Sequence, residues 1–290
     1  MNMLSIITPS YNRSYTLERA FISLKNQTYK DFEWIIVDDG SVDDTEVICK
    51  SFVSNDFPIR YYKKENGGKH TAVNMGVKVA KGDYILILDS DDSLPSQSVE
   101  IIHSYCLQVD QDCSFGGVAG YMAHHNGDVI GHGCERRVID SNAIDIRYLH
   151  HLKGDMCEVF RASILREFTF PEVEGERFCP ESLLWNRIAL HYKLRYFPEV
   201  VYYRDYLDGG LTDNIIKIRM KSPLLTCMCY AEQSRLRIPF VQRMKSAINY
   251  WRFGLCVKGK KQLSTISCWW MWTWLVGYIM HKRDKRVTGL

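Results

Sequence analysis

Three carboxylates follow an apolar run in the first third of the chain, and their spacing could bind a metal ion. Residues 84–88 (Y-I-L-I-L) precede the segment Asp89-Ser90-Asp91-Asp92. The apolar run predicts a buried strand, and carboxylates at its end would repel one another and lose hydration. A divalent cation relieves that repulsion, and Mg²⁺ commonly binds one or two carboxylates together with substrate phosphates. The segment therefore favours a metal site that carries a diphosphate, with an acidic loop that caps the next helix as the structural alternative.

The elements that must position this segment alternate between strands and helices. Strands are predicted over residues 4–8, 32–37, 59–62 and 84–88, and helices over residues 15–26, after Ser41 and over 70–80. This alternation predicts right-handed βαβ units and a mostly parallel sheet, in which ligands bind beyond the carboxyl ends of the strands. Three polar motifs fall at such ends, namely Thr8-Pro9-Ser10, Asp38-Asp39-Gly40 and Asp89-Ser90-Asp91. We therefore expect them to share one rim of the sheet.

Four longer strings surround these motifs. They read I-I-T-P-S-Y-N-R (6–13), W-I-I-V-D-D-G-S-V-D-D-T (34–45), K-E-N-G-G-K-H-T-A-V-N-M-G (64–76) and A-K-G-D-Y-I-L-I-L-D-S-D-D (80–92), and R-F-C-P-E-S-L-L-W-N-R-I-A (177–189) is a weaker fifth. In this order they resemble the family 2 glycosyltransferases. The resemblance implies an α/β, GT-A Rossmann-like fold with a mostly parallel central sheet flanked by helices. It also implies an inverting, metal-dependent transferase that uses a nucleotide-diphospho-sugar, with a UDP-sugar as the expected donor.

The resemblance implies roles for individual residues at the predicted rim. Asp39 would accept a hydrogen bond from the uracil ring, and Asp38 would support its loop. Asp91 would bind Mn²⁺ or Mg²⁺ directly, and Asp89 would face the ribose or a metal-bound water. The other donor-binding candidates are Thr8, Pro9, Ser10, Asn66, Gly67, Gly68, Lys69 and Ser90.

An inverting transfer also needs a base that takes the proton of the acceptor hydroxyl. In the family this base is usually the Asp of a Glu-Asp pair, and the corresponding position here reads Pro180-Glu181. Glu181 is therefore the implied base, and a carboxylate that only favours the start of a helix is the alternative. Asp155 and Glu158 form the rival carboxylate pair and, with Trp185, are the acceptor-side candidates.

The chain is long enough for one large domain and a sizeable appendage, and its charge is unevenly distributed. Residues 217–290 contain 15 Lys and Arg against 2 Asp and Glu, a net charge of +13, whereas the preceding residues carry a net charge of −10. We expect a catalytic domain over 1–215, with a nucleotide-binding half over 1–110 and an acceptor-side half over 111–215. A helical, basic and aromatic region is expected over 216–290.

The basic region contains a tryptophan-rich apolar block over residues 266–280, with lysine and arginine on both sides. The block is shorter than the roughly 20 residues that span a bilayer, and Trp prefers the headgroup boundary. We therefore expect residues 247–286 to contact an anionic membrane surface. Packing on the core or on a partner subunit, and a spanning helix, are the alternatives. Nucleic acid is not expected, because the aromatic residues are not interleaved with the basic ones.

A membrane-bound sugar transferase commonly acts on a lipid-linked acceptor, so we expect a glycan acceptor on a polyprenyl carrier in cell-surface polysaccharide synthesis. The ten cysteines lack metal-binding or redox spacing, which predicts free thiols in a reducing compartment. The first residues lack the basic and apolar segments of a signal peptide. The expected location is the cytoplasm, peripheral on the inner face of the cell membrane. The sequence gives no indication of the oligomeric state.

Three other functions explain less of the sequence. A nucleotidyltransferase would carry a glycine-rich basic loop after the first strand, where this chain has T-P-S-Y-N-R. A glycoside hydrolase needs two opposed carboxylates and no nucleotide, which leaves Asp38-Asp39 unexplained. A catalytically impaired module that binds nucleotide sugar or lipid is favoured by the missing Glu-Asp pair, but the intact Asp89-Ser90-Asp91 opposes it.

Overall fold

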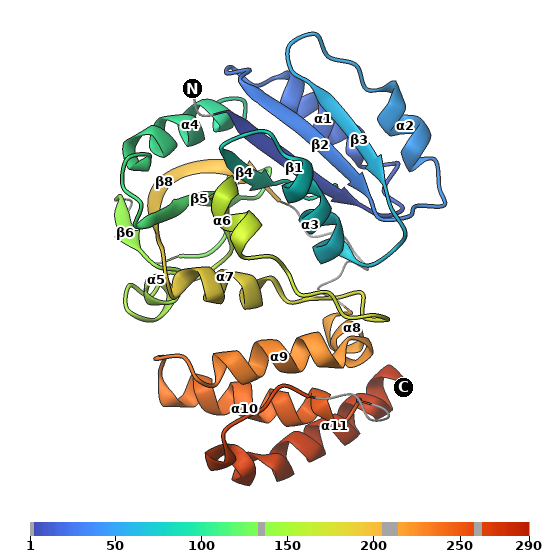
Figure 1. Cartoon of the computed structure of the whole chain (residues 1–290), viewed down its shortest axis with the longest axis vertical. Helices are drawn as coiled ribbons and strands as arrows, with labels where there is room; N and C mark the ends of the chain where they lie inside the picture. Colours follow the sequence, from blue (N-terminus) through green and yellow to red (C-terminus); the bar gives the residue numbers. More distant parts are fainter. Residues whose placement is uncertain (1–2, 133–136, 205–213, 258–262, 290) are drawn as a thin grey trace. The chain divides into compact units, whose positions relative to one another are not determined.

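The structure is a computed structural model that describes residues 3–132, 137–204, 214–257 and 263–289. These residues form two compact units (Figure 1). The first unit comprises the described residues of 3–169 and 187–204, and the second those of 170–186 and 214–289. Residues 170–186 thus group with the C-terminal helices, and the domain boundary expected at residue 215 stays a prediction.

The first unit is built on a sheet of eight strands in the order β3-β2-β1-β4-β7-β5-β8-β6. The strands are β1 (Leu4–Ser10), β2 (Phe32–Asp38), β3 (Ile59–Lys63), β4 (Tyr84–Ile87), β5 (Phe115–Ala123), β6 (Ile139–Ser141), β7 (Met156–Arg161) and β8 (Lys193–Tyr203). The first four in sheet order are parallel, and β5 is parallel to β8. β7 runs antiparallel to both β4 and β5, and β6 runs antiparallel to β8. The mostly parallel α/β sheet expected from the sequence is confirmed.

Helices connect the strands of this unit. They are α1 (Leu17–Lys25), α2 (Thr45–Ser51), α3 (Lys69–Val79), α4 (Ser98–Val109), α5 (Asp145–Tyr148) and α6 (Ala162–Glu167). A further helix, α7 (Glu181–Ala189), crosses the division between the units. Because side chains alternate along a strand, β1 contacts helices on both faces of the sheet. Ile6 packs in the core cluster that includes Leu17 and Leu24 of α1. Ile7 faces α3, where a Cβ added at Gly76 would lie 2.5 Å from its Cγ2 atom.

The expected start of α2 needs a correction. A helix that begins directly after Ser41 would have this serine as its N-cap, but the helix begins at Thr45 and Asp44 occupies the N-cap position. The Ser41 hydroxyl instead accepts a hydrogen bond from the backbone N–H of Asn12 (2.8 Å). The serine therefore joins the loop after β2 to the loop after β1, because a hydroxyl can satisfy a backbone donor outside a helix as well as at its end.

The second unit contains four further helices and a 3₁₀ turn among its described residues. They are α8 (Ile215–Lys221), α9 (Pro223–Gln233), α10 (Phe240–Gly254), η1 (Cys268–Thr273) and α11 (Trp274–Thr288). Figure 1 shows α10 running between α9 and α11, and a cluster that includes Cys227, Tyr250 and Phe253 forms the core. None of the helices in the described part of the chain combines the length and apolar character that crossing a bilayer requires.

Candidate active site

The three polar motifs lie at the same end of neighbouring parallel strands. Ser10, the last residue of β1, pairs with Asp38, the last residue of β2. On the other side of β1, Ile7 pairs with Ile87, the last residue of β4, so that Asp89 follows at the same end. The carboxyl ends of β1, β2 and β4 therefore gather these motifs into one rim, as the alternation of strands and helices predicts.

Asp39 is the most constrained carboxylate of this rim. Its side chain is 4% exposed, and its Oδ1 atom accepts hydrogen bonds from Lys64 Nζ (2.8 Å) and the Gly67 N–H (2.9 Å). Its Oδ2 atom accepts from the Gly68 N–H (2.7 Å). A carboxylate has about four lone-pair positions, and the three donors occupy two on Oδ1 and one on Oδ2. One acceptor position on Oδ2 remains for a ligand N–H.

Glycine is required where the loop after β2 meets the loop before α3. Gly40 has φ +81°, and a Cβ there would lie 2.9 Å from the Asn66 backbone nitrogen. Gly68 has φ +97° and directs its N–H at Asp39. Residues other than glycine rarely adopt a positive φ of this kind, so the two glycines let the loops approach each other. The Asn66-Gly67-Gly68 string therefore shapes the binding loop of Asp39.

Asp38 and Thr8 are both engaged within the protein. The Asp38 carboxylate accepts hydrogen bonds from the Ser41 N–H (2.8 Å) and from the Tyr61 hydroxyl (2.6 Å). The Thr8 hydroxyl accepts one from Trp34 Nε1 (2.9 Å), while Pro9, the next residue, lies within β1. The Asp38 carboxylate thus joins the loop after β2 to β3, and its part in binding a nucleotide stays a prediction.

Ser10 has an unsatisfied hydroxyl. The residue is 3% exposed, and its Oγ atom has no hydrogen-bond partner among the described residues. Its carbonyl accepts from the Asp39 N–H (2.8 Å), which places the two residues side by side. An unpartnered buried hydroxyl costs free energy, so a ligand that supplied a partner here would bind more tightly.

The acidic segment after β4 contains two partly exposed carboxylates. Asp89 Oδ1 lies 2.6 Å from Lys69 Nζ, and their side chains are 31% and 32% exposed. Asp91 Oδ2 lies 4.0 Å from Arg13 Nη2, with side chains 25% and 27% exposed. Ser90, between the two aspartates, is buried. Each candidate metal-binding carboxylate thus has a cation of the chain beside it. Sequence reasoning missed Arg13, although it ends the first of the matching strings.

Asp92 and Tyr202 hold the acidic segment in place; Asp92 was expected only as part of that segment, and Tyr202 was not a predicted site residue. The Tyr202 hydroxyl donates to Asp92 Oδ2 (2.7 Å) and accepts from the Asp89 N–H (2.9 Å). Burial of Asp92, with the negative charge of Asp89 nearby, raises the pKa of this carboxyl to about 7. No local signal could have found this contact, because Tyr202 lies on β8, 110 residues away.

The residues present fit a divalent cation only if a substrate supplies further ligands. Within the described residues, no group of three or more His, Cys, Asp or Glu side chains is arranged to hold a metal ion. Asp89 and Asp91 could supply two carboxylates, and phosphate oxygens commonly complete a Mg²⁺ or Mn²⁺ site of this kind. The donor set therefore matches a cation that arrives with a diphosphate.

The acceptor-side candidates are distributed over both units. Asp155 forms an ion pair with Arg204 (2.6 Å), and Glu158 lies on β7 opposite Ala119 of β5. In the second unit, Glu181 is the first residue of α7 and is exposed. The Trp185 ring packs edge-on against the Phe170 ring, with 5.9 Å between the ring centroids. The catalytic and acceptor roles of these residues stay predictions.

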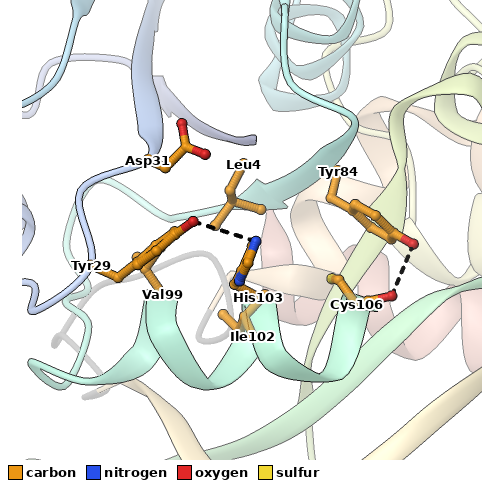
Figure 2. Close-up of a pocket in the computed structure, with 8 residues that line it drawn as sticks. All are labelled: Leu4, Tyr29, Asp31, Tyr84, Val99, Ile102, His103 and Cys106. Atoms are coloured by element: carbon orange, nitrogen blue, oxygen red, sulfur yellow. Dashed lines mark hydrogen bonds between the residues drawn. The ribbon is translucent and has the colours of Figure 1, made fainter. Parts of the chain in front are cut away.

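A small pocket lies at the opposite end of the strands from this rim (Figure 2). Leu4 and Tyr84, the first residues of β1 and β4, line it together with Tyr29 and His103, whose rings stack at 4.7 Å. Most of its other lining residues are apolar, and none was a predicted site residue. The rim, rather than this pocket, is the candidate active site.

Comparison with known proteins identifies a family for this chain. Residues 5–164 match the model of the family described as "Glycosyl transferase family 2". Glycosyltransferase GlyG of Streptococcus pneumoniae is 38% identical over 120 residues, which cover 41% of this chain and 40% of that protein. The GalNAc(5)-diNAcBac-PP-undecaprenol beta-1,3-glucosyltransferase of Campylobacter jejuni is 29% identical over 188 residues, or 64% of this chain and 59% of that protein. The chain thus spans less than two thirds of the length of these two relatives.

Solved structures share the fold at low sequence identity. TarS 1-349 of S. aureus in complex with UDP-GlcNAc has a TM-score of 0.62 and 17% identity, and the match covers 95% of this chain and 79% of that one. The mannosyltransferase PcManGT of Pyrobaculum calidifontis, in complex with GDP-Man and Mn²⁺, has a TM-score of 0.55 and 17% identity. This match covers 100% of this chain and 76% of that one.

Proposed function

This chain belongs to glycosyl transferase family 2 and is a glycosyltransferase, and we propose that it moves a sugar from a UDP-sugar to a hydroxyl of a glycan acceptor with inversion at the anomeric carbon. One observation supports the donor above all. The same sheet rim holds a buried carboxylate with one open acceptor position, Asp39, and two partly exposed carboxylates, Asp89 and Asp91.

In this proposal the two ends of the rim bind the two ends of the nucleotide. Asp39 Oδ2 accepts the N–H of the base, and the Ser10 hydroxyl gains the partner that it lacks. Asp89 and Asp91 hold a divalent cation, Mn²⁺ or Mg²⁺, with Asp91 as the direct ligand and Asp89 as a direct or water-mediated one. TarS 1-349 is in complex with UDP-GlcNAc and PcManGT with GDP-Man and Mn²⁺, which supports a nucleotide sugar and a divalent cation as the ligands.

The chemistry requires a leaving group that carries charge and a base that takes a proton. A bound divalent cation stabilises the negative charge that develops on the nucleoside diphosphate. The oxygen of the acceptor hydroxyl attacks the anomeric carbon from the face opposite the diphosphate. Glu181, the proposed base, takes the proton of this hydroxyl during the attack. The bond from this carbon to the diphosphate oxygen breaks, and its electron pair leaves with the diphosphate. Asp155 and Glu158 are the alternative bases.

We propose a lipid-linked glycan as acceptor, in cell-surface polysaccharide synthesis on the inner face of the cell membrane. The acceptor of the Campylobacter jejuni relative, an undecaprenol-linked saccharide by its name, supports this proposal. The nine cysteines among the described residues are all free, which agrees with a reducing compartment. The basic and aromatic C-terminal region is the proposed membrane contact.

The donor proposal is tested by thermal unfolding of the full chain with UDP and Mn²⁺, compared with UDP and a chelator. We expect stabilisation only when metal and nucleotide are present together, since ligand binding to the folded state raises its stability. Asp91→Ala should abolish the shift. Asp56→Ala is the matched control, because the Asp56 side chain is 56% exposed and its ion pair with Lys30 is long, at 3.9 Å.

The outcome also separates the competing functions. Stabilisation by UDP that does not depend on metal or on Asp91 would contradict the proposed site. If UDP-sugars bind but a panel of UDP- and GDP-sugars shows no metal-dependent release of nucleotide, the chain is a binding module. Release of pyrophosphate from a nucleoside triphosphate would indicate a nucleotidyltransferase.

A further inference from the structure

Apolar side chains are exposed in a continuous stretch of η1 and the first half of α11. Seven of them are between 41% and 68% exposed, namely Trp269, Met271, Trp272, Trp274, Leu275, Val276 and Ile279. Soluble monomeric domains rarely expose large apolar side chains in such a group, and a group of this kind commonly marks an interaction site. Three of the seven are tryptophans, the residue that concentrates at membrane–water interfaces.

The opposite side of α11 is firmly packed on α10. Gly277, His281 and Asp284 are buried, and their spacing of four and three residues places them on one face of the helix. A Cβ at Gly277 would lie only 2.6 Å from Trp251 Cβ. His281 Nδ1 donates to the Arg252 carbonyl (3.0 Å), and Arg252 forms an ion pair with Asp284. One face of α11 is thus buried by packing within its own unit, which was one of the alternatives for this segment. The other face is exposed.

The exposed face of α11 is apolar in its first half and cationic in its second. Leu275, Ile279, Lys282 and Arg286 follow one another at spacings of four, three and four residues, so they form one stripe on the side away from Gly277. At 1.5 Å per residue this stripe is about 16 Å long. Lys282 extends over the Tyr278 ring at 5.5 Å. A long basic side chain can keep its charge at a phosphate while its stem covers apolar surface.

The charges on this helix are of one sign at its surface. Lys282, Arg283, Lys285 and Arg286 are exposed, and Asp284, the acidic residue of α11, is buried against Arg252. A second copy of the chain placed on the same face would bring two such cationic groups together, which is unfavourable. An anionic surface would instead be attracted to them.

We propose that η1 and α11 form a membrane-binding face. Its aromatic and aliphatic side chains enter the headgroup region of a bilayer, and Lys282, Arg283, Lys285 and Arg286 bind the phosphates of anionic lipids. The helix lies in the plane of the membrane surface with Gly277, His281 and Asp284 toward the protein. This inference deepens the membrane location of the proposed function and does not depend on the transfer reaction.

The test is co-sedimentation of the full chain with vesicles of phosphatidylcholine alone or with 30% phosphatidylglycerol. We expect binding to the anionic vesicles that weakens with added salt. Lys282→Gln with Arg286→Gln should weaken this binding about 25-fold, since each basic residue near an anionic surface contributes a factor of about 5. Leu275→Glu should weaken binding to both kinds of vesicle at least 10-fold. Val53→Glu is the control and should leave vesicle binding unchanged, since it alters a side chain that is 71% exposed in the other unit.

One control separates this test from the donor site. The thermal shift with UDP and Mn²⁺ should be the same in all these variants, which shows that they are folded. Vesicle binding that is absent in the original chain, or unchanged in the Leu275→Glu variant, would overturn the proposal. A stable dimer that Leu275→Glu dissociates would overturn it as well, because a second copy would then cover the face.

Discussion

Asp39 should hold the loop before α3 even when no nucleotide is bound, and Asp39→Asn tests this directly. The carboxylate accepts three hydrogen bonds, from Lys64, Gly67 and Gly68, and its side chain is 4% exposed. An asparagine in the same rotamer retains one acceptor atom. If that oxygen keeps Lys64 and Gly67, the amide N–H groups face the Gly68 N–H, donor against donor. The substitution therefore removes the charge of a buried ion pair and leaves a buried backbone donor unsatisfied.

The expected cost follows from these losses. Breaking a buried ion pair by removing one partner typically costs about 3–5 kcal/mol, and an unsatisfied buried donor accounts for about 1–3 kcal/mol of such a loss. We expect Asp39→Asn to lower the free energy of unfolding of the first unit by about 3–5 kcal/mol, measured by urea denaturation. Hydrogen exchange should locate the effect, with faster exchange at the Gly67 and Gly68 amides than in the original chain.

Two controls make this prediction specific. Asp56→Asn, a change at an exposed carboxylate, should alter the free energy of unfolding by no more than about 0.5 kcal/mol. Lys64→Met should leave the Gly67 and Gly68 amides protected, because the carboxylate still accepts from both. If Asp39→Asn unfolds at the same urea concentration as the original chain and both glycine amides stay protected, Asp39 does not clamp this loop, and the reasoning is wrong.

Three further changes test other parts of the structure. Asp92 has a pKa raised to about 7, so the stability that its protonated form provides is complete below about pH 4 and is lost as the pH rises through 7. Asp92→Asn, which can still accept from Tyr202, should remove this pH dependence and unfold at a higher temperature than the original chain at pH 8. Gly277→Ala should destabilise the second unit by about 1–3 kcal/mol in urea, because the added methyl meets Trp251. Glu181→Gln should keep the thermal shift with UDP and Mn²⁺ but stop release of UDP from UDP-sugars; retained release would move the base to another carboxylate.

The first four strands could be predicted closely because their signals are local. Each begins at the predicted residue, Leu4, Phe32, Ile59 and Tyr84, where a short apolar run starts between turn signals. The parallel order then follows from the intervening helices, and with it the common rim. The antiparallel β7 between β4 and β5 could not be predicted in this way, since its position depends on pairings between distant segments.

The candidate site shows the same division between local and distant information. The identity of the rim carboxylates was visible in the motifs, but their partners were not. The Tyr202 hydroxyl donates a hydrogen bond to Asp92, and Lys69, the first residue of α3, forms an ion pair with Asp89. In the C-terminal region, composition alone could not separate core packing from membrane contact. The helical register separates a packed face from an exposed one, because Gly277 and Leu275 lie on opposite faces of α11.

The cations beside the rim carboxylates divide the site into a fixed and an adjustable end. Asp39 is buried and held by two backbone donors as well as Lys64, so exchanging its partners would cost several kcal/mol. The Lys69–Asp89 pair is about one third exposed, and an ion pair of that kind contributes only about 0–1 kcal/mol. Arg13 is 4.0 Å from Asp91, at the limit of an ion pair. A divalent cation could therefore replace both partners at little cost, which would free Lys69 and Arg13 for the phosphates that arrive with it, while the Asp39 end of the rim keeps its geometry.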